Sequence, residues 1–322
     1  MLMQSNKGIS KFLVYFLPFL ILALALFNFR GVFGETLLTK FTKSNPIKIV
    51  FTGDINFDRY VRRQALKKGN YNYIFDQVRD IFNSADLVVS NLEGSITKYN
   101  SISMGTEIGS KNNYIFTFPP ETAPVLYNEN IRLVNLGNNH IFNFGSKGVQ
   151  QTKVFLGENK VNYFGHLAVN QSFADETYVG DFAGFRILFV NYNQFIKTDL
   201  DKLLVSIKAE KENVDFVILY AHWGSEYQPV ANQTIQALAH KFIDAGVDLI
   251  IGSHPHVVQQ SEIYQGKKIY YSLGNFIFDQ YFSDATREGL VVGVEINPDN
   301  KETIFKEYKT HIEFDSGVTL IE

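Results

Sequence analysis

The 322-residue sequence contains no cysteine. Disulfide bonds and thiolate metal sites are therefore excluded, and any metal ion must be held by histidine, aspartate, glutamate or asparagine. An excess of positive charge is also lacking, since 30 lysines and arginines stand against 33 acidic residues. This balance is unlike the basic footprint of a nucleic-acid binder, so we expect no nucleic-acid partner. From Ile47 onward the sequence shows no linker, low-complexity tract or repeat, which predicts a single domain over residues 47–322.

One long hydrophobic run is present, near the N-terminus. Residues 12–29 (FLVYFLPFLILALALFNF) are 18 residues without a charge, and they follow a short basic start at residues 1–11. A run of this length is sufficient for one spanning helix. No small-x-small cleavage site follows, so an uncleaved signal anchor is favoured over a cleaved signal peptide. We expect residues 1–11 in the cytoplasm, a linker at residues 30–46, and the C-terminal domain outside the cytoplasmic membrane.

Strand-like and helix-like patterns alternate through the middle of the domain. Short apolar runs rich in β-branched residues predict strands, and residues 234–246 and 198–212 predict helices between them. The first helix should end at Gly246, and Thr198 is a possible N-cap of the second. This alternation indicates α/β architecture. Residues 288–314 contain two further strands with no helix between them, so part of the sheet system should be antiparallel.

Six of the strand-like runs end in short polar motifs. In α/β sheets the carboxyl ends of the strands share one rim, where ligands bind, so these motifs should meet there. Each motif alone is also compatible with a turn or a packed core residue, but their combination favours a shared site. The motifs are Gly53-Asp54, Asn91-Leu92-Glu93, Asn138-Asn139-His140, His222-Trp223-Gly224, His254-Pro255-His256 and Gly274-Asn275.

The polar side chains of these motifs suit divalent metal ions. A mixed set of oxygen and nitrogen ligands favours Mn, Fe or Zn. Six ligands exceed the need of one tetrahedral ion, so we expect two ions about 3.5–4 Å apart that share Glu93 and activate water. His140 would remain beside them as the general acid for the leaving group. The six predicted ligands are Asp54, Glu93, Asn139, His222, His254 and His256.

The two histidines around Pro255 should point in one direction. Residues i and i+2 of an extended segment face the same side, and the proline disfavours helical backbone at His254. We therefore expect an extended segment that directs His254 and His256 at the two ions. The remaining histidines, His166, His240 and His311, are expected to be structural or solvent-facing.

The same stretches resemble the bacterial CapA family, named for poly-γ-glutamate capsule synthesis, which is similar to calcineurin-like metallophosphoesterases. The matching pieces, in family order, are GDINFDR, NLEGSIT, NLGNNHIFNFG, YAHWGSEY, IIGSHPHVVQ and YSLGNFIFD, from residue 53 to about 279. The resemblance implies a four-layer α/β/β/α sandwich with the site at one edge. The N-terminal transmembrane helix predicted above also suits the family, and we expect a single-pass protein of the bacterial cell membrane with an extracytoplasmic C-terminal domain.

Roles are carried over from the family position by position. The first metal's ligands are implied to be Asp54, Glu93 and His256, and the second's to be Glu93, Asn139, His222 and His254. His140 stands where the wider superfamily keeps its proton donor. Arg59 matches a family arginine that would bind a substrate phosphate or carboxylate. Asn275 would orient a loop or a substrate at the rim, and a purely turn-forming role is an equal alternative.

Three positions depart from the family pattern. Asn56 replaces a histidine that many metallophosphoesterases carry, which implies looser binding of the first metal. Asn143 replaces an aspartate three residues after His140, and an amide stabilises an imidazolium less well than a carboxylate does. His166 stands in place of a small Gly-Ala-Gly turn.

Three functions compete at this point. The first is a membrane-anchored, metal-dependent hydrolase that acts on a phosphoester or related bond in envelope polymer metabolism. The alternative is a non-catalytic accessory subunit that joins membrane-bound polyglutamate ligase or export subunits and binds the anionic polymer through metal or Arg59. The third, a carbohydrate- or peptide-binding ectodomain, rests on the 17 tyrosines and 29 phenylalanines, most of which we expect in the core.

Overall fold

The computed structural model describes residues 44–165 and 173–321. The predicted anchor at residues 12–29 and His166 lie outside these ranges. Within them, no helix has the length and apolar character needed to cross a membrane. Anchoring in the membrane therefore stays a prediction.

The first of two large β-sheets has eight strands in the order β16-β15-β14-β1-β2-β5-β6, and β13 pairs with β1 beside this path. Strands β1, β2, β5 and β6 run parallel, whereas β14, β15 and β16 are antiparallel. The predicted antiparallel part is thereby confirmed. The strands are β1 Ile47–Ile55, β2 Leu87–Leu92, β5 Ile131–Asn135, β6 Asn162–Phe164, β13 Asn275–Ile277, β14 Glu288–Ile296, β15 Thr303–Ile312 and β16 Val318–Ile321.

The second large sheet has six strands in the order β11-β12-β10-β9-β8-β7. Its inner strands are parallel, and β7 and β11 are antiparallel at the two edges. The strands are β7 Thr177–Phe182, β8 Phe185–Asn193, β9 Phe216–His222, β10 Leu249–Ser253, β11 Ser261–Tyr264 and β12 Lys267–Tyr270. A separate two-stranded sheet joins β3 (Ser95–Ile96) to β4 (Thr117–Phe118).

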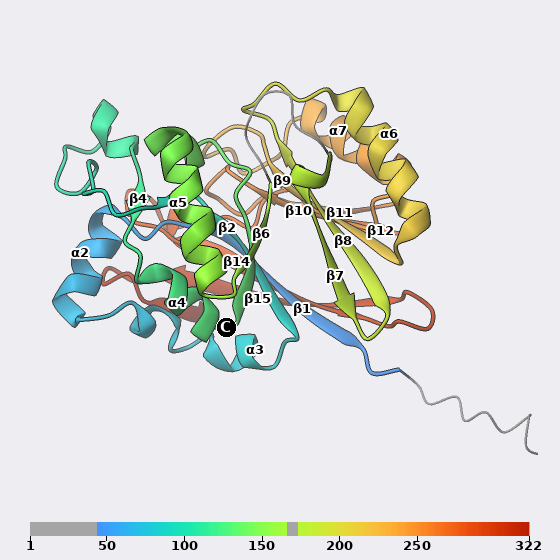
Figure 1. Cartoon of the computed structure of the whole chain (residues 1–322), viewed down its shortest axis with the longest axis horizontal. Coiled ribbons are helices and arrows are strands. Elements are labelled where there is room, and N and C mark those ends of the chain that lie inside the picture. The colour runs from blue at the N-terminus through green and yellow to red at the C-terminus, as the bar shows by residue number, and fades with distance from the viewer. Residues whose placement is uncertain (1–43, 166–172, 322) are drawn as a thin grey trace, which may run out of the picture. The chain divides into compact units, whose positions relative to one another are not determined.

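Helices lie on the outer sides of the two sheets (Figure 1). Those packed on the first sheet are α2 Arg59–Lys68, α3 Arg79–Asn83, α4 Thr122–Asn128 and α5 Gly145–Glu158. Against the second sheet pack α6 Leu200–Glu210 and α7 Gln233–Asp244. A short α8, Asp284–Arg287, precedes β14. Single 3₁₀ turns occur at Asn72–Phe75, Lys111–Tyr114, Ile141–Phe144, Phe173–Glu176 and Lys211–Asn213.

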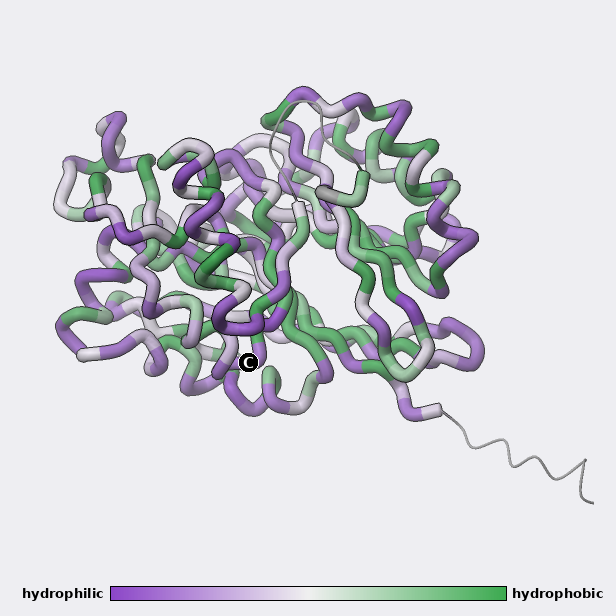
Figure 2. Tube along the Cα trace, viewed as in Figure 1, coloured by the Kyte–Doolittle hydropathy of each residue, from purple (hydrophilic) through white to green (hydrophobic). Residues whose placement is uncertain are grey.

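Three hydrophobic cores separate these layers. Val50 and Val88 of the first sheet face the helices, while their neighbours Ile49 and Val89 face the second sheet. The other side of the second sheet packs on α6 and α7 in a third core. Successive residues of a strand point to opposite faces, so a strand buried on both sides needs a continuous apolar run. Figure 2 shows this pattern as green strands in both sheets, and the predicted mixed α/β sandwich is confirmed.

The two predicted helices are present, and one of the predicted helix ends is wrong. Helix α7 is capped by Asn232. Gly246, with a φ of 108°, follows the end of the helix as predicted. The N-cap of α6 is Asp199, whose carboxylate accepts from the Lys202 N–H at 3.1 Å, and not Thr198. A carboxylate satisfies this free N–H and also suits the positive end of the helix dipole.

Most large aromatic side chains of the described residues serve the core, as expected. The largest fully buried side chains, Trp223, Tyr220 and Phe51 among them, are aromatic.

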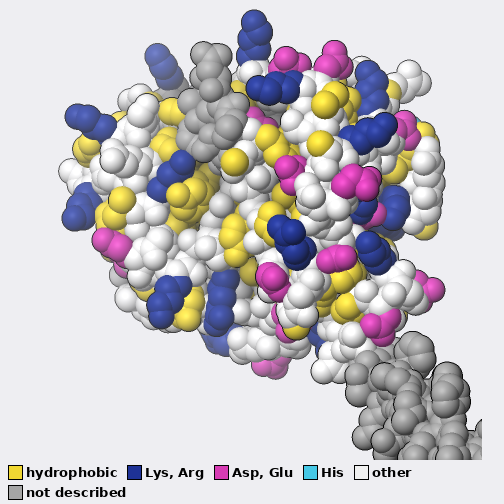
Figure 3. Space-filling model, turned by 45° about the vertical axis from the view of Figure 1, so that its right-hand side comes forward, with side chains coloured by type: hydrophobic (Ala, Val, Ile, Leu, Met, Phe, Trp, Pro, Cys, Tyr) yellow, Lys and Arg dark blue, Asp and Glu magenta, His cyan; other side chains and the backbone are white. Residues whose placement is uncertain are grey.

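On the face shown in Figure 3, basic and acidic side chains are interspersed without a patch of one sign.

Candidate metal centre

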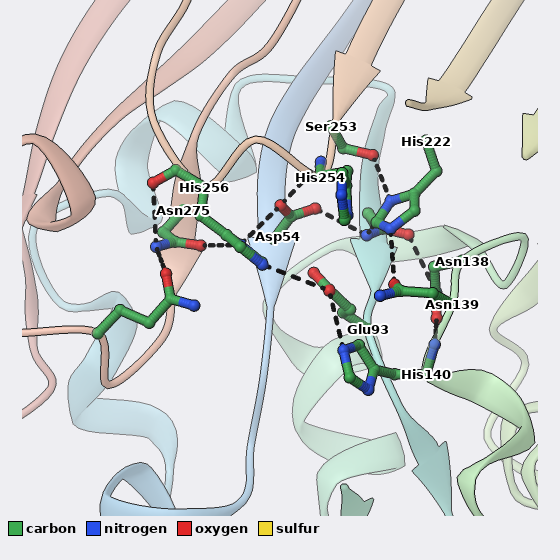
Figure 4. A network of polar contacts seen from close by, with 12 residues as sticks. Asp54, Glu93, Asn138, Asn139, His140, His222, Ser253, His254, His256 and Asn275 are labelled. Carbon is green, nitrogen blue, oxygen red and sulfur yellow. Dashed lines mark hydrogen bonds and ion pairs between the residues drawn. The ribbon is translucent and has the colours of Figure 1, made fainter. Parts of the chain in front are cut away.

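Strands from both large sheets end at one edge of the sandwich, where the polar motifs come together (Figure 4). Parallel strands place their carboxyl ends on the same side, which brings residues distant in sequence into contact. Asp54 is at the end of β1 and Glu93 follows β2, while His222 ends β9. Asn139 and His140 come after β5, and His254 and His256 after β10.

Glu93 lies in the middle of this cluster. Its side chain is fully buried, and neither carboxylate oxygen has a hydrogen-bond partner. Its Oε1 lies 3.7 Å from Nε2 of His256 and 3.8 Å from Nε2 of His140. Burial raises the pKa of Glu93 well above its usual range, and the nearby Asp54 carboxylate raises it further. A buried, unpartnered carboxylate is costly, and a bound cation offsets that cost.

Three overlapping groups of side chains have metal-ligand spacing. In each group, the ligand atoms lie within 4.8 Å of one another. Two of the groups share Glu93, and their members belong to the two ligand sets that the family resemblance implies. The oxygen Oδ1 of Asn139 lies 2.9 Å from Nε2 of His222, so the amide is beside the second group. The groups are Asp54–Glu93–His256, Glu93–His222–His254 and Glu226–His254–His256.

Glu226 in the third group is the site residue that the sequence analysis missed. It lies four residues after His222, within the quoted segment YAHWGSEY. The signal was an acidic residue close to a predicted ligand. It was overlooked because the segment after β9 is a loop, whose side-chain directions follow no sequence period.

Asp54 is fixed by contacts to both sheets. Its Oδ1 accepts from the Asn91 side chain at 2.7 Å, and its Oδ2 accepts from the backbone N–H of His254 at 3.1 Å. The same Oδ2 lies 3.3 Å from Nδ1 of His256. The carboxylate therefore ties the first sheet to the segment after β10 and remains within reach of a cation beside Glu93.

The loop of residues 254–256, hereafter the histidine loop, does not have the expected backbone. His254 has a φ of 95° and His256 a φ of 57°, so the prediction of an extended segment is wrong. Both imidazoles nevertheless point into the cluster (Figure 4). Positive φ is unfavourable for residues with a Cβ and is kept only where the surroundings enforce it. Here the His254 N–H is held by Asp54, and the Pro255 carbonyl accepts from the Tyr227 N–H at 2.8 Å.

Asn275 determines which nitrogen of His256 faces the cluster. The amide Nδ2 of Asn275 has three acceptor oxygens within 3.3 Å, those of His256, Gln280 and Thr286, so its Oδ1 must face Nδ1 of His256, 2.9 Å away. The imidazole then carries its hydrogen on Nδ1 and directs Nε2 at Glu93. Asn275 is fully buried with its amide engaged, which favours the loop-orienting alternative over contact with a substrate.

The surroundings of His256 and His254 shift the pKa values of the two rings in opposite directions. Burial alone lowers the pKa of His256, but the Glu93 and Asp54 carboxylates outweigh burial and raise that pKa to about 9. For His254, burial and the charge of His256 lower the pKa to about 3. The Nδ1 atom of His254 has no hydrogen-bond partner. A neutral imidazole with a free nitrogen is the form that binds metal.

His222 is held from behind in a similar way. Its Nδ1 lies 2.9 Å from the Ser253 hydroxyl and 3.3 Å from the amide nitrogen of Asn91, which can only donate. This arrangement leaves Nε2 of His222 directed at the side of the cluster where Asn139 lies. Burial lowers the pKa of His222 well below its usual range, so the ring is neutral.

His140 sits at the edge of the cluster with its lone pair inward. Its Nδ1 is 3.1 Å from the Tyr114 carbonyl and 3.1 Å from Oδ1 of Asn143, and a carbonyl can only accept, so the hydrogen is on Nδ1. Burial lowers the pKa of His140 to about 4. The neutral ring thus offers Nε2 as a proton acceptor, and it must first be protonated to serve as the predicted general acid.

Arg59 and Asn56 are already engaged in local contacts. The Arg59 guanidinium forms an ion pair with Asp279 and lies 4.9 Å from the ring centre of Phe116. Its predicted substrate contact stays a prediction. Oδ1 of Asn56 accepts from the Asp58 N–H at 2.8 Å, and its Nδ2 is buried without a hydrogen-bond partner. The looser binding of the first metal that this residue implies stays a prediction.

Comparison with known proteins places the chain in a family. The model of the family "Bacterial capsule synthesis protein PGA_cap" matches residues 48–280, a span that contains all six predicted ligands. The "PGA biosynthesis protein CapA" of Bacillus subtilis (strain 168) is 30% identical over 311 residues, which cover 90% of this chain and 78% of that protein. The "Capsule biosynthesis protein CapA" of Bacillus anthracis is 27% identical, over 78% of this chain and 64% of the relative.

More distant similarities were also found. A relative from Mycobacterium tuberculosis, whose name includes "polyglutamine synthesis accessory protein", is 25% identical over 61% of this chain and 56% of its own length. The crystal structure of a hypothetical protein from Thermus thermophilus aligns with 82% of this chain and 98% of its own, at 16% identity. Its TM-score of 0.48 is too low to carry an argument. The family match and the Bacillus relatives are decisive: this chain belongs to the bacterial capsule synthesis protein family PGA_cap.

Proposed function

We propose that this protein is a membrane-anchored, metal-dependent hydrolase of the calcineurin-like metallophosphoesterase kind, which cleaves a phosphoester or related bond in capsule or poly-γ-glutamate metabolism. The observation that carries the proposal is Glu93, a fully buried carboxylate with two unpartnered oxygens among histidines and Asp54. The names of the Bacillus relatives support the pathway. The α/β/β/α order of layers supports the comparison with metallophosphoesterases.

The cluster fits two divalent cations, with Mn, Fe or Zn as candidates. Such cations, when bound, supply Lewis-acid chemistry to the substrate. One would be held by Asp54, Glu93 and His256, and the other by Glu93, Asn139, His222 and His254.

The remaining polar groups of the chain prepare this centre for reaction. Asn275 and Ser253 fix the rings of His256 and His222 from behind, so each keeps one nitrogen directed inward. His140 holds Nε2 at the edge of the centre and can accept a proton there. Once protonated, the same atom can return the proton to a leaving group. The leaving group of the substrate would then lie beside His140.

A second candidate is the non-catalytic accessory subunit that binds polymer carboxylates through the cations. The state of His140 favours it, because the ring is neutral and its Nδ1 is paired with the amide of Asn143 and not with a carboxylate. A neutral histidine in this setting is a weak acid catalyst. The two candidates share the metal centre and differ only in turnover.

Metal content and turnover can be measured on the same samples. The full-length chain, purified in detergent, is stripped with chelator, reloaded with Mn²⁺, analysed for bound metal, and assayed with a generic phosphodiester. We expect two ions per chain, and in His140→Ala a loss of turnover of about 10²–10⁴-fold with both ions retained. His311→Ala is the matched control and should behave as wild type.

The outcomes separate the candidates. Full metal occupancy without any phosphodiester turnover favours the accessory subunit. A wild-type chain that binds no divalent cation contradicts both candidates, because the Glu93 cluster would then have another purpose.

A further inference from the structure

Glu226 is held against the histidine loop by hydrogen bonds on both sides of it. The Trp223 N–H donates to the carbonyl of Ser253 at 3.2 Å, and the Tyr227 N–H donates to the carbonyl of Pro255 at 2.8 Å. Two bonds that bracket so short a segment leave the residues between them little freedom. The position of Glu226 over the loop is thus built into the structure.

The Glu226 carboxylate forms a ligand group with the two histidines of this loop. Its ligand atom and those of His254 and His256 lie within 4.8 Å of one another. The Nδ1 atom of His254 has no partner although the residue is only 3% exposed. Glu226 reaches solvent, whereas Asp54 and Glu93 are fully buried. The group of Glu226, His254 and His256, hereafter the outer group, therefore lies on the solvent side of the centre.

The three ligand groups cannot all be filled at once. His254 belongs to the outer group and to one Glu93 group, and His256 belongs to the outer group and to the other. Asn275 occupies Nδ1 of His256, which leaves only Nε2 for a metal. A ring nitrogen binds one cation at a time. Because each Glu93 group shares one histidine with the outer group, transfer of a cation inward would require the exchange of Glu226 for Glu93 and would retain that histidine.

We propose that Glu226, His254 and His256 form the entry position through which divalent cations reach and leave the buried centre. This inference rests on the metal centre of the proposed function and adds a route to it. A solvent-facing carboxylate attracts the hydrated cation, and the two imidazoles replace part of its water before it reaches Glu93.

Uptake can be followed in real time through Trp223, the one tryptophan of the chain, which adjoins His222. Rapid mixing of metal-free, full-length protein with Co²⁺ should quench its fluorescence as the centre fills. The variants are Glu226→Gln and, as a control with the same change of charge outside the cluster, Glu262→Gln. In Glu226→Gln we expect Co²⁺ association to slow about 10-fold. Release to a chelator should slow by the same factor, because one route serves both directions, and Kd should stay unchanged.

Two results would overturn the entry role while leaving the metal centre intact. Equal association and release rates in Glu226→Gln and wild type would show that Glu226 takes no part. Faster release with a weaker Kd would show a permanent ligand and not an entry position. If the wild-type chain takes up no Co²⁺, the proposed function is overturned as well, so the two failures are distinguishable.

Discussion

Among the residues that the structure describes, two clusters pair a histidine with a glutamate, and they differ in unused bonding capacity. On the surface, Glu262 pairs with His240 and accepts from the Tyr271 hydroxyl at 2.9 Å, and both of the paired side chains are about a third exposed. In the centre, Glu93 is fully buried and neither of its oxygens has a hydrogen-bond partner. The comparison teaches that proximity of acid and imidazole does not mark a functional site. A buried carboxylate left without hydrogen bonds requires an explanation, and a bound cation would supply one.

The two clusters also differ in the backbone conformation of their histidines and in the contacts that hold those histidines in place. His240 lies within helix α7 and stacks on Tyr264, with 3.8 Å between ring centres. His254 and His256 both have positive φ and are held by contacts from Asp54 and Asn275. An unfavourable backbone maintained by such contacts is typical of sites selected for function.

The largest contrast is expected in Mn²⁺-dependent stabilisation, between replacement of Glu93 in the centre and replacement of Glu262 on the surface. With Mn²⁺ at about 100 times Kd, binding should stabilise the wild-type fold by about 2.7 kcal/mol, which raises the unfolding midpoint by about 5 °C for a domain of this size. Glu93→Gln should abolish this rise, because it removes the shared ligand, and Glu262→Gln should retain it. Differential scanning fluorimetry with and without chelator measures both.

The pH dependence of the Mn²⁺-induced rise in the unfolding midpoint provides a second test of the metal centre. The pKa of His256 is raised to about 9, so a cation must displace a proton there and Mn²⁺ affinity should increase as the pH rises toward that value. A Glu93→Gln variant that keeps the full Mn²⁺-dependent rise would contradict the metal centre.

A smaller loss of Mn²⁺ binding is expected on replacement of Asn275, which holds the ring of His256. Asn275→Ala removes the acceptor that keeps the hydrogen on Nδ1 of that ring, so Mn²⁺ affinity should fall about 10–100-fold. Titration against a fluorescent chelator measures the change. Asn162→Ala is the control, since that amide bonds to the Tyr178 hydroxyl outside the cluster. Unchanged affinity in Asn275→Ala would return Asn275 to its other predicted role, contact with a substrate.

The smallest effect should come from the surface pair. His240→Ala removes a partly exposed ion pair and a ring contact, so it should lower the free energy of unfolding by no more than about 1 kcal/mol. Urea unfolding measures this, and Mn²⁺ affinity should match that of wild type. A loss of Mn²⁺ affinity in His240→Ala similar to that in Asn275→Ala would remove the distinction between the two clusters.

Much of the fold and the membership of the centre were predictable from local patterns. Apolar periodicity located α7 and the antiparallel strands β14 and β15. The polar endings of the parallel strands converge because such strands end on the same side of a sheet. The N-cap of α6 was misplaced by one residue, since Thr198 and Asp199 are both acceptable caps and only the contact with Lys202 distinguishes them.

The sequence by itself determined which side chains are available to hold a cation, because strand periodicity and the absence of cysteine restrict both their chemistry and their place. Only the tertiary structure decided how they are presented: the positive φ of His254, the ring nitrogen that His256 turns inward, and the position of Glu226 over the loop. The physical reason is that each depends on a hydrogen bond between segments distant in the chain. His254 and its partner Asp54, for example, are 200 residues apart. No local pattern encodes such a bond.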